Sequence, residues 1–275
     1  MANYIRPIEL PDALAALAER KFFVLAGATD FYPAQVGRVT DHDILDLGGV
    51  EALAGIERQG DYWRIGAMAT WRDLVDADLP PCFAGLKQAA RQVGGPQIQN
   101  TATIAGNLCN ASPAADGVPP LLCLAAEIEF QDQAGVHVLP LSEFILGNRR
   151  TALRPDQVLT AILVPTLLEQ GRAGFAKLGA RSSLVISIVM VAGLLQLDEQ
   201  GRVANANLAV GACSEVAQRL ALLEAELIGQ SDLSSVVRPE HFSHLSPLDD
   251  HRGTAAYRLD AAATITKRLL QDLSS

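Results

Sequence analysis

The sequence lacks the patterns on which several common classes of site depend. Its four cysteines form no CxxC pair, whereas iron–sulfur clusters and structural zinc ions are usually held by closely spaced thiolates. Its five histidines show no spacing typical of metal ligands. There is no GxGxxG, GxxxxGK(S/T), GxSxG or HExxH motif, which argues against Rossmann and P-loop nucleotide sites and against the common hydrolases. We therefore expect neither a metal site nor a hydrolytic centre in this chain.

Positive charge is also scarce. The chain has 22 lysines and arginines against 31 acidic residues, which gives a formal net charge of -9. Binding of nucleic acid through phosphate neutralisation is therefore not expected, nor is binding to an anionic membrane surface. An anionic ligand would have to be held by local backbone N–H groups or by single side chains.

Long apolar runs are missing as well. Residues 1–20 contain no apolar segment typical of a signal peptide. The apolar run from Ser182 to Leu197 is shorter than the roughly 20 residues that a membrane-spanning helix needs, so we expect a buried strand there. These features predict a cytoplasmic protein without a membrane span. In such a protein reduced thiols are expected at all four cysteines, which are Cys82, Cys109, Cys123 and Cys213.

What the sequence does contain is enough apolar residues for two compact domains. It has 275 residues, 49% of them hydrophobic, and a chain of this length can bury a sizeable core. At the start, a helix over Leu10–Leu17 and strands at Phe22–Ala26 and Ile44–Leu47 predict a small parallel βαβ-like unit. From about Gly55 the pattern changes to a hairpin over 56–65.

The middle of the chain combines helices with one long polar segment. Helices are expected from Thr70 to Val75 and from Ala84 to Val93, with Thr70 as an N-cap. The segment from Gly94 to Pro119 is rich in Gly, Asn, Ser and Pro and is expected to be a loop. Loops of that length are uncommon in compact domains and are usually functional. A helix opened by proline is then expected at Pro119–Ala126.

The last third of the chain has a different pattern. Ser187–Leu197 and Val203–Ala212 are apolar strands around a turn, and Val216–Leu227 has the spacing of a helix with one buried face. The polar stretch Ser231–Arg252 is either an interface or, as we favour, a surface loop, and His241 and His244 within it are expected to be solvated. A final helix is expected over Thr254–Leu273.

Two short glycine-centred segments have the composition of an anion-binding turn. One is Leu25–Asp30, which follows an apolar strand, and the other is Thr103–Asn107, inside the long loop. Successive N–H groups in such a turn point at an anion, and the missing side chains allow a phosphate to approach closely. Two ordinary tight turns would have the same composition, so the segments alone leave both interpretations open.

Taken together with their surroundings, these segments resemble a known family. The sequence GNLCNASPAAD (Gly106–Asp116), preceded by NTATI (Asn100–Ile104), is similar to the second FAD-binding motif of the flavoprotein subunits of molybdenum hydroxylases. LAGATDF (Leu25–Phe31) resembles the first motif of that family. FAKLGARSSLVIS (Phe175–Ser187) and DDHRGTAAYR (Asp249–Arg258) resemble the start and the closing helix of its C-terminal domain. Four motifs in the family's order are far more specific than one glycine turn.

The resemblance implies an α+β fold. A two-part FAD-binding domain of the vanillyl-alcohol-oxidase-like type would be followed by a smaller α+β C-terminal domain with an antiparallel sheet. The expected boundaries are residues 1–168, with subdomains of about 1–54 and 55–168, and residues 169–275.

The resemblance also implies a function. The chain would be the FAD-binding electron-transfer subunit of a molybdenum hydroxylase complex. Its partners would be a large subunit with the molybdenum cofactor and a small subunit with two 2Fe–2S clusters, assembled as a dimer of heterotrimers. Electrons would pass from the clusters through FAD to a terminal acceptor, which could be NAD, a quinone or a small carrier. Such a chain would be inactive toward the organic substrate alone. A stand-alone FAD oxidoreductase of the same fold, and a non-catalytic partner without FAD, remain alternatives.

The resemblance assigns cofactor contacts but no catalytic residue. The first loop would wrap the FAD pyrophosphate, and the second would form a wall around the phosphates and the ribityl chain. Asp116 would accept hydrogen bonds from ribityl or ribose hydroxyls, and Lys177 would lie near the flavin and favour its anionic reduced form. The expected contacts are Val24, Leu25, Ala26, Gly27, Ala28, Thr29, Asp30, Phe31, Val93, Thr103, Ile104, Ala105, Gly106, Asn107, Asp116, Leu159 and Lys177.

The sequence departs from the family at two of these positions. The family usually has a glycine pair in both loops, whereas Ala28 and Ala105 replace one glycine of each pair here. A left-handed conformation costs a residue other than glycine about 1–2 kcal/mol. We therefore expect Gly27 and Gly106, rather than the alanines, to carry any positive φ. Cys109, inside the second motif, is expected to be a small buried packing residue.

Overall fold

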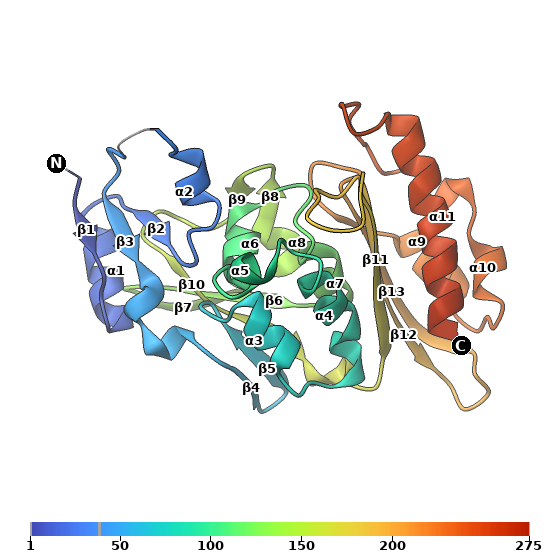
Figure 1. Cartoon of the computed structure of the whole chain (residues 1–275). Helices are drawn as coiled ribbons and strands as arrows, with labels where there is room; N and C mark the ends of the chain where they lie inside the picture. The colour runs from blue at the N-terminus through green and yellow to red at the C-terminus, as the bar shows by residue number, and fades with distance from the viewer. Residues whose placement is uncertain (1, 38–39, 275) are drawn as a thin grey trace.

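The computed structural model describes residues 2–37 and 40–274. Three main sheets follow one another along the molecule (Figure 1), and β8 and β9 form a further two-stranded sheet. The strands are β1 (Tyr4–Ile5), β2 (Phe23–Leu25), β3 (Ile44–Asp46), β4 (Ile56–Gln59), β5 (Tyr62–Gly66), β6 (Glu127–Asp132), β7 (Gly135–Pro140), β8 (Ile145–Gly147), β9 (Arg150–Thr151), β10 (Val158–Pro165), β11 (Arg172–Leu178), β12 (Val189–Leu197), β13 (Val203–Gly211) and β14 (Gln218–Arg219). The α-helices are α1 (Leu10–Glu19), α2 (Phe31–Ala34), α3 (Trp71–Asp76), α4 (Ala84–Ala90), α5 (Pro96–Gln99), α6 (Ile104–Asn110), α7 (Val118–Cys123), α8 (Leu141–Phe144), α9 (Ala221–Leu227), α10 (Leu233–Val236) and α11 (Ala255–Ser274). Short 3-10 turns are η1 (Leu47–Gly49), η2 (Glu51–Leu53), η3 (Pro81–Phe83), η4 (Thr166–Leu168) and η5 (Pro239–Phe242).

The first sheet is the small parallel unit that the sequence predicts. Its three strands have the order β1-β3-β2, and both pairings are parallel. Helix α1 buries Ala13, Leu14 and Leu17, the apolar face of its periodic pattern. Strand β2 is an outer strand of this sheet, and the first candidate loop begins at its carboxyl end.

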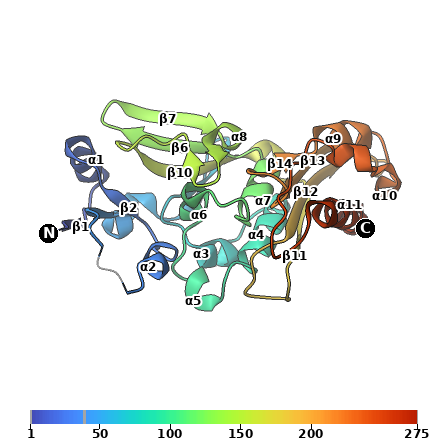
Figure 2. The ribbon, with the colours of Figure 1, turned by 90° about the horizontal axis from the view of Figure 1, so that it is seen from above.

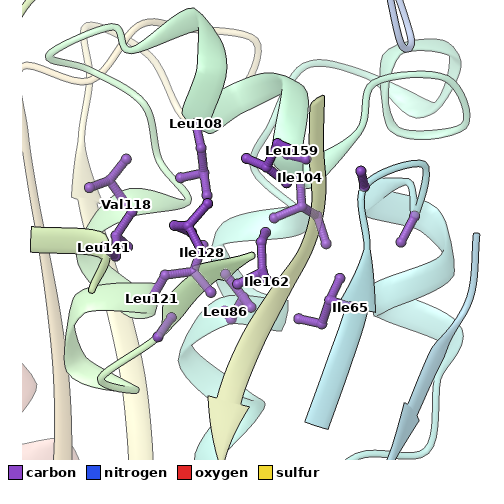
Figure 3. Close-up of a cluster of buried hydrophobic side chains, with 14 of the residues drawn as sticks. Ile65, Leu86, Ile104, Leu108, Val118, Leu121, Ile128, Leu141, Leu159 and Ile162 are labelled. Atoms are coloured by element: carbon purple, nitrogen blue, oxygen red, sulfur yellow. The ribbon is translucent and has the colours of Figure 1, made fainter. Parts of the chain in front are cut away.

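The second sheet is antiparallel and carries the main core. Its strands have the order β4-β5-β10-β6-β7, and Figure 3 shows Ile104 and Leu108 of α6 packed over Ile128 and Ile162 of this sheet. The predicted N-cap at Thr70 is confirmed as a capping box with Asp73. The core therefore fixes α6, which carries the second motif.

The third sheet lies between helices of the two halves of the chain. Its order is β11-β12-β13-β14, all antiparallel, and α11 packs on one face while α4 and α7 pack on the other (Figures 1 and 2). Along β12, Met190, Ala192 and Leu194 join the main core, whereas the alternate residues Val189 and Val191 join the core under α11. The strand is buried on both faces, as its uncharged apolar sequence predicts.

The closing motif DDHRGTAAYR ties α11 to this sheet. The guanidinium of Arg258, a residue only 5% exposed, donates to the backbone oxygens of Ile188 and Ala212 and pairs with Asp250 at 2.7 Å. The N–H of Arg252 and the Arg258 guanidinium together lower the pKa of the Asp250 carboxyl to about 2. The motif is thus structural and lies apart from the two candidate loops.

Several predicted elements differ from the structure. The segment Gly94–Pro119 is not one irregular loop, because it contains the short helices α5 and α6. The helix expected from Val216 begins only at Ala221, since Gln218–Arg219 pairs with β13 instead.

The polar stretch Ser231–Arg252 is also more ordered than a solvated loop. His241 is 0% exposed, its Nδ1 accepts from the Arg238 N–H, and its Nε2 lies 3.2 Å from a carboxylate oxygen of Glu226. The expectation of a solvated side chain is therefore wrong for His241, although His244 is exposed. Apolar residues of the same stretch, such as Phe242, provide the core that the polar composition concealed.

The described part of the chain has no helix that is both long and apolar enough to cross a bilayer. Within residues 2–37 and 40–274 no group of three or more His, Cys, Asp or Glu side chains is arranged to hold a metal ion. The four cysteines are free thiols.

Candidate functional site

One large cleft brings the predicted cofactor residues together. Its volume is about 810 Å³, near the upper end of the range for small-molecule and cofactor sites. It is lined by the loop after β2, by α6 and the turn that follows it, by β10, and by Lys177 near the end of β11. Every residue of the predicted set lines it except Ile104, whose side chain is fully buried in the core (Figure 3).

The first loop lies directly against the second motif at Gly27. A Cβ at this position would lie 2.0 Å from the Thr101 backbone oxygen and 2.9 Å from the Ala102 Cα. Both neighbours are backbone atoms and cannot rotate away. Gly27 is therefore required for close approach between the two loops, and not for a positive φ as the sequence suggested.

The left-handed residue of the first loop is Ala28, with a φ of 54°. The expectation that Gly27 rather than Ala28 carries the positive φ is wrong for this loop. In the second motif neither Ala105 nor Gly106 has a positive φ, because both lie in α6. The turn around Ala28 leaves its backbone donors unpaired. Within the described residues, no intramolecular hydrogen bond uses the N–H groups of Gly27, Ala28 or Thr29. A left-handed residue in a turn that leaves successive N–H groups free is the geometry of an anion-binding nest.

This conformation predicts opposite effects for two alanine-to-glycine changes. Ala28→Gly removes a left-handed penalty of about 1–2 kcal/mol and adds a backbone-entropy cost of about 0.5–1 kcal/mol, so the free energy of unfolding should rise by up to about 1 kcal/mol. Ala105→Gly, in α6 with no positive φ, should lower it by about 1 kcal/mol. Urea unfolding of both variants without cofactor measures the difference, and a loss in both would contradict the assignment of strain to Ala28.

The second motif is a capped helix start and not a loop. The Thr103 hydroxyl accepts from the Gly106 N–H at 2.9 Å, and the Thr103 backbone oxygen accepts from the Asn107 N–H. The Ile104 N–H is also used, by Ala69. Of the two interpretations left open for Thr103–Asn107, the nest is therefore wrong, because most of its backbone donors are occupied. The first loop supplies the free backbone donors instead.

Asn107 carries an unpaired polar atom at the wall of the cleft. Its side chain lines the cleft, but its Oδ1 is buried and is one of two buried side-chain polar atoms without a partner among the described residues. Leaving such an atom unpaired costs about 1–3 kcal/mol. A hydroxyl or N–H group of a ligand is the kind of partner that this oxygen lacks.

A buried carboxylate joins the C-terminal part of the chain to the cleft. Asp116 accepts from Lys177 Nζ at 2.5 Å through Oδ2 and from the Ser187 hydroxyl at 2.5 Å through Oδ1. The side chains of Lys177 and Asp116 are 6% and 8% exposed. Burial raises the pKa of the Asp116 carboxyl, and Lys177 and Ser187 oppose that rise. The lysine expected beside a flavin is thus already paired with an anion.

The remaining walls of the cleft are largely apolar. Val93 and Leu159 line it as the resemblance implies, and Val185 and Ile186 add a wall from the loop before β12. Cys109 also lines it and is exposed, so the expectation of a buried packing residue is wrong. It lies one helical turn after Ala105 on α6, and both residues line the cleft.

Some lining residues were missed by sequence reasoning. Trp71 begins α3 and is 1% exposed, and Gln157 is 2% exposed and donates to Asp132 at 3.0 Å. Arg149 follows β8 and is exposed at the cleft. Nothing in the sequence distinguishes Arg149 from a solvated arginine in a loop, since its place depends on how β8 and β9 pair.

Two family sequence patterns together match most of the chain. The family described as "FAD binding domain in molybdopterin dehydrogenase" matches residues 1–167. The family described as "CO dehydrogenase flavoprotein C-terminal domain" matches residues 175–273.

Individual relatives match over nearly the whole length. The chain is 30% identical over 290 aligned positions to a xanthine dehydrogenase FAD-binding subunit of Escherichia coli, covering 98% of this chain and 95% of that subunit. It is 27% identical to the carbon monoxide dehydrogenase medium chain of Afipia carboxidovorans, with coverage of 98% and 95%. The solved structure of reconstituted CO dehydrogenase from Oligotropha carboxidovorans has a TM-score of 0.90 at 24% identity, covering 100% of this chain and 98% of that one.

These matches confirm the resemblance drawn from the four motifs and the predicted fold class. The fold is a two-part FAD-binding domain of mixed helix and sheet, followed by a smaller part with an antiparallel sheet.

Proposed function

Because the chain belongs to the family of FAD-binding flavoprotein subunits of molybdenum hydroxylases and has FAD as its cofactor, we propose that it is the electron-transfer subunit of such a complex. It receives electrons from iron–sulfur clusters on a small partner subunit and delivers them to a terminal acceptor. The hydroxylation itself takes place on a large partner subunit with a molybdenum cofactor. The three chains assemble as a dimer of heterotrimers.

The residues of the cleft fit FAD at three places. The free N–H groups of the Gly27–Thr29 turn are suited to the pyrophosphate, since such a turn presents several donors to one anion. The unpaired amide of Asn107 is suited to a ribityl or ribose hydroxyl. The apolar walls at Val93 and Leu159, with the Asp116–Lys177 pair at the C-terminal side, are suited to the flavin ring.

Bound FAD supplies the redox chemistry, because a flavin takes up single electrons and releases them singly or in pairs. The chain's own residues bind and orient it and set its electrostatic surroundings. Lys177 and Asp116 together carry no net charge, so they present a dipole to the ring and not an isolated cation. Asp116 keeps the lysine Nζ at one position, and Ser187 fixes the carboxylate.

The surface beside the flavin end is suited to a partner. Leu184 and Ile186, on the loop that leads into β12, are 56% and 54% exposed. Exposed apolar side chains of this kind mark interaction sites when they gather beside a functional cleft.

We assign residues 1–168 to FAD binding, with a division near residue 54, and 169–275 to the C-terminal domain that completes the cleft.

Asn107→Ala should separate cofactor binding from stability. The substitution removes an atom that has no partner in the fold, so the free energy of unfolding without FAD should stay equal or rise by up to about 1–3 kcal/mol. The affinity for FAD should fall about 10-fold, the value of one hydrogen bond to the cofactor. Flavin fluorescence titration measures the affinity. Asn100→Ala is the matched control, since Asn100 is exposed and lies outside the cleft. An equal loss in both variants would contradict the role of Asn107.

Both motifs and Lys177 line one cleft, in a chain that both family patterns match, and this convergence supports the proposed function most strongly. The purified chain should be yellow and should release one FAD per chain on denaturation. A colourless preparation that takes up no added FAD would favour the non-catalytic partner of the same fold. Flavin reduction by an organic substrate with this chain alone would favour a stand-alone oxidoreductase.

A further inference from the structure

A hydrogen-bonded chain of three polar residues connects the first loop to the turn after β8. Asn110 Nδ2 donates to Asp30 Oδ2 at 2.6 Å, and the Arg149 guanidinium donates to Asn110 Oδ1. All three residues line the cleft. Asp30 directly follows Thr29, whose N–H has no internal partner. The chain therefore places Arg149 on the side of the cleft where the first loop presents its free donors.

Arg149 is the cleft cation that forms no ion pair among the described residues. The cleft is lined by two cationic side chains, Arg149 and Lys177. Lys177 is paired with Asp116, whereas none of the ion pairs among residues 2–37 and 40–274 includes Arg149. The Asp30 carboxylate accepts its hydrogen bond from Asn110 and not from Arg149. A guanidinium keeps several donors in a fixed fork, so one bond to Asn110 leaves most of them available.

The backbone of Arg149 is held in a strained conformation. Its φ is 58°, in the left-handed region that residues other than glycine rarely adopt. Its N–H donates to the Ala111 backbone oxygen at 2.9 Å, which fixes the β8–β9 turn against the end of α6. Glycine or asparagine would adopt this conformation at lower cost. Strain of this kind at a cleft is typical of a side chain retained for function.

We propose that Arg149 binds the pyrophosphate of FAD, opposite the nest at Gly27–Thr29, and supplies the positive charge that the backbone donors lack. This assignment rests on the proposed function and adds a binding residue to it. The pyrophosphate carries two negative charges, and charge-assisted bonds from arginine to phosphate are stronger than neutral ones. Asn110 orients the guanidinium, and Asp30 orients Asn110.

The test compares two adjacent arginines in the full-length chain. Arg149→Asn keeps a residue that tolerates the left-handed conformation and removes the charge. Arg150→Asn makes the same charge change on β9, where the side chain donates to the Leu146 backbone oxygen and does not line the cleft. The affinities for FAD and for riboflavin, which lacks the pyrophosphate, are measured by fluorescence at several NaCl concentrations, and the thermal midpoint is measured without ligand.

Arg149→Asn should weaken FAD binding about 10- to 100-fold, the range for a charge-assisted bond, and should reduce its dependence on salt. The affinity for riboflavin should change less than about 2-fold, and the thermal midpoint should stay equal or rise as strain is relieved. Arg149→Lys should recover part of the FAD affinity, and Arg150→Asn should retain all of it.

Unchanged FAD affinity in Arg149→Asn overturns the assignment, as does an equal loss for riboflavin, which would mean that Arg149 only shapes the cleft. An equal loss in Arg150→Asn also overturns it, since the effect would then come from net charge. Failure of the unmodified chain to take up FAD is a different outcome: it overturns the proposed function, and the assignment falls with it.

Discussion

Gly27→Ala is expected to weaken FAD binding at least about 100-fold, which corresponds to almost 3 kcal/mol. The added Cβ would lie 2.0 Å from the Thr101 oxygen and 2.8 Å from its carbonyl carbon. Both are backbone atoms of the second motif, so the first loop has to move by about an ångström or more to relieve the overlap. Such a movement separates the free N–H groups of the first loop from the wall formed by α6. Titration of the variant with FAD measures the effect.

Gly95→Ala is the matched control for this change. A Cβ at Gly95 would meet only the ends of the Gln97 and Leu184 side chains, at 3.4 Å, and Gly95 does not line the cleft. Its FAD affinity should stay within about 2-fold of the unmodified chain. If Gly27→Ala bound FAD as tightly as Gly95→Ala, the close contact between the two loops would not be required for binding.

Asp116→Ala is expected to be the most destabilising change at the site. It leaves Lys177, whose side chain is 6% exposed, without its carboxylate, and removing one partner of a buried ion pair costs about 3–5 kcal/mol. Because both side chains line the cleft, we expect the lower part of this range, about 3 kcal/mol. The midpoint of thermal unfolding without FAD should fall by roughly 6–10 °C.

The double variant Asp116→Leu/Lys177→Met separates the ion pair from simple packing. Replacing both charged groups with apolar ones of similar size is often neutral or stabilising, so this variant should lie within about 1 kcal/mol of the unmodified chain. Its FAD affinity should nevertheless be reduced, since both polar contacts are lost. A double variant as unstable as Asp116→Ala would show that the carboxylate matters for a reason other than pairing with Lys177.

The parts of this site that could be predicted from sequence are those fixed by short motifs. Leu25–Asp30 follows a strand whose apolar sequence is plain, and its composition permits little but a tight turn. Asp116 and Lys177 were assigned through the resemblance, and the structure brings them together at 2.5 Å. The apolar run before Asp198 predicts a strand because no charge interrupts it, and β12 is buried along most of its length.

The parts that could not be predicted depend on contacts between distant segments. The need for glycine at position 27 arises from Thr101, and nothing in the first loop reveals that neighbour. Composition suggested that α6 was a loop, because Gly106 and Asn107 are poor helix formers; the Thr103 cap and the burial of Ile104 and Leu108 override that preference. The strain at Ala28 and Arg149 follows from backbone geometry, which residue type alone does not report.

We propose that this chain relays electrons and does not oxidise the organic substrate itself. The most direct test isolates the complex from its native host through a tag on this chain and follows the visible absorbance of the flavin in a stopped-flow instrument. A compound that bleaches the flavin in the complex is then mixed with the FAD-loaded chain alone. We expect molybdenum and iron in the complex, rapid bleaching there, and no bleaching in the isolated chain. Bleaching of the isolated chain at the rate of the complex would contradict this proposal.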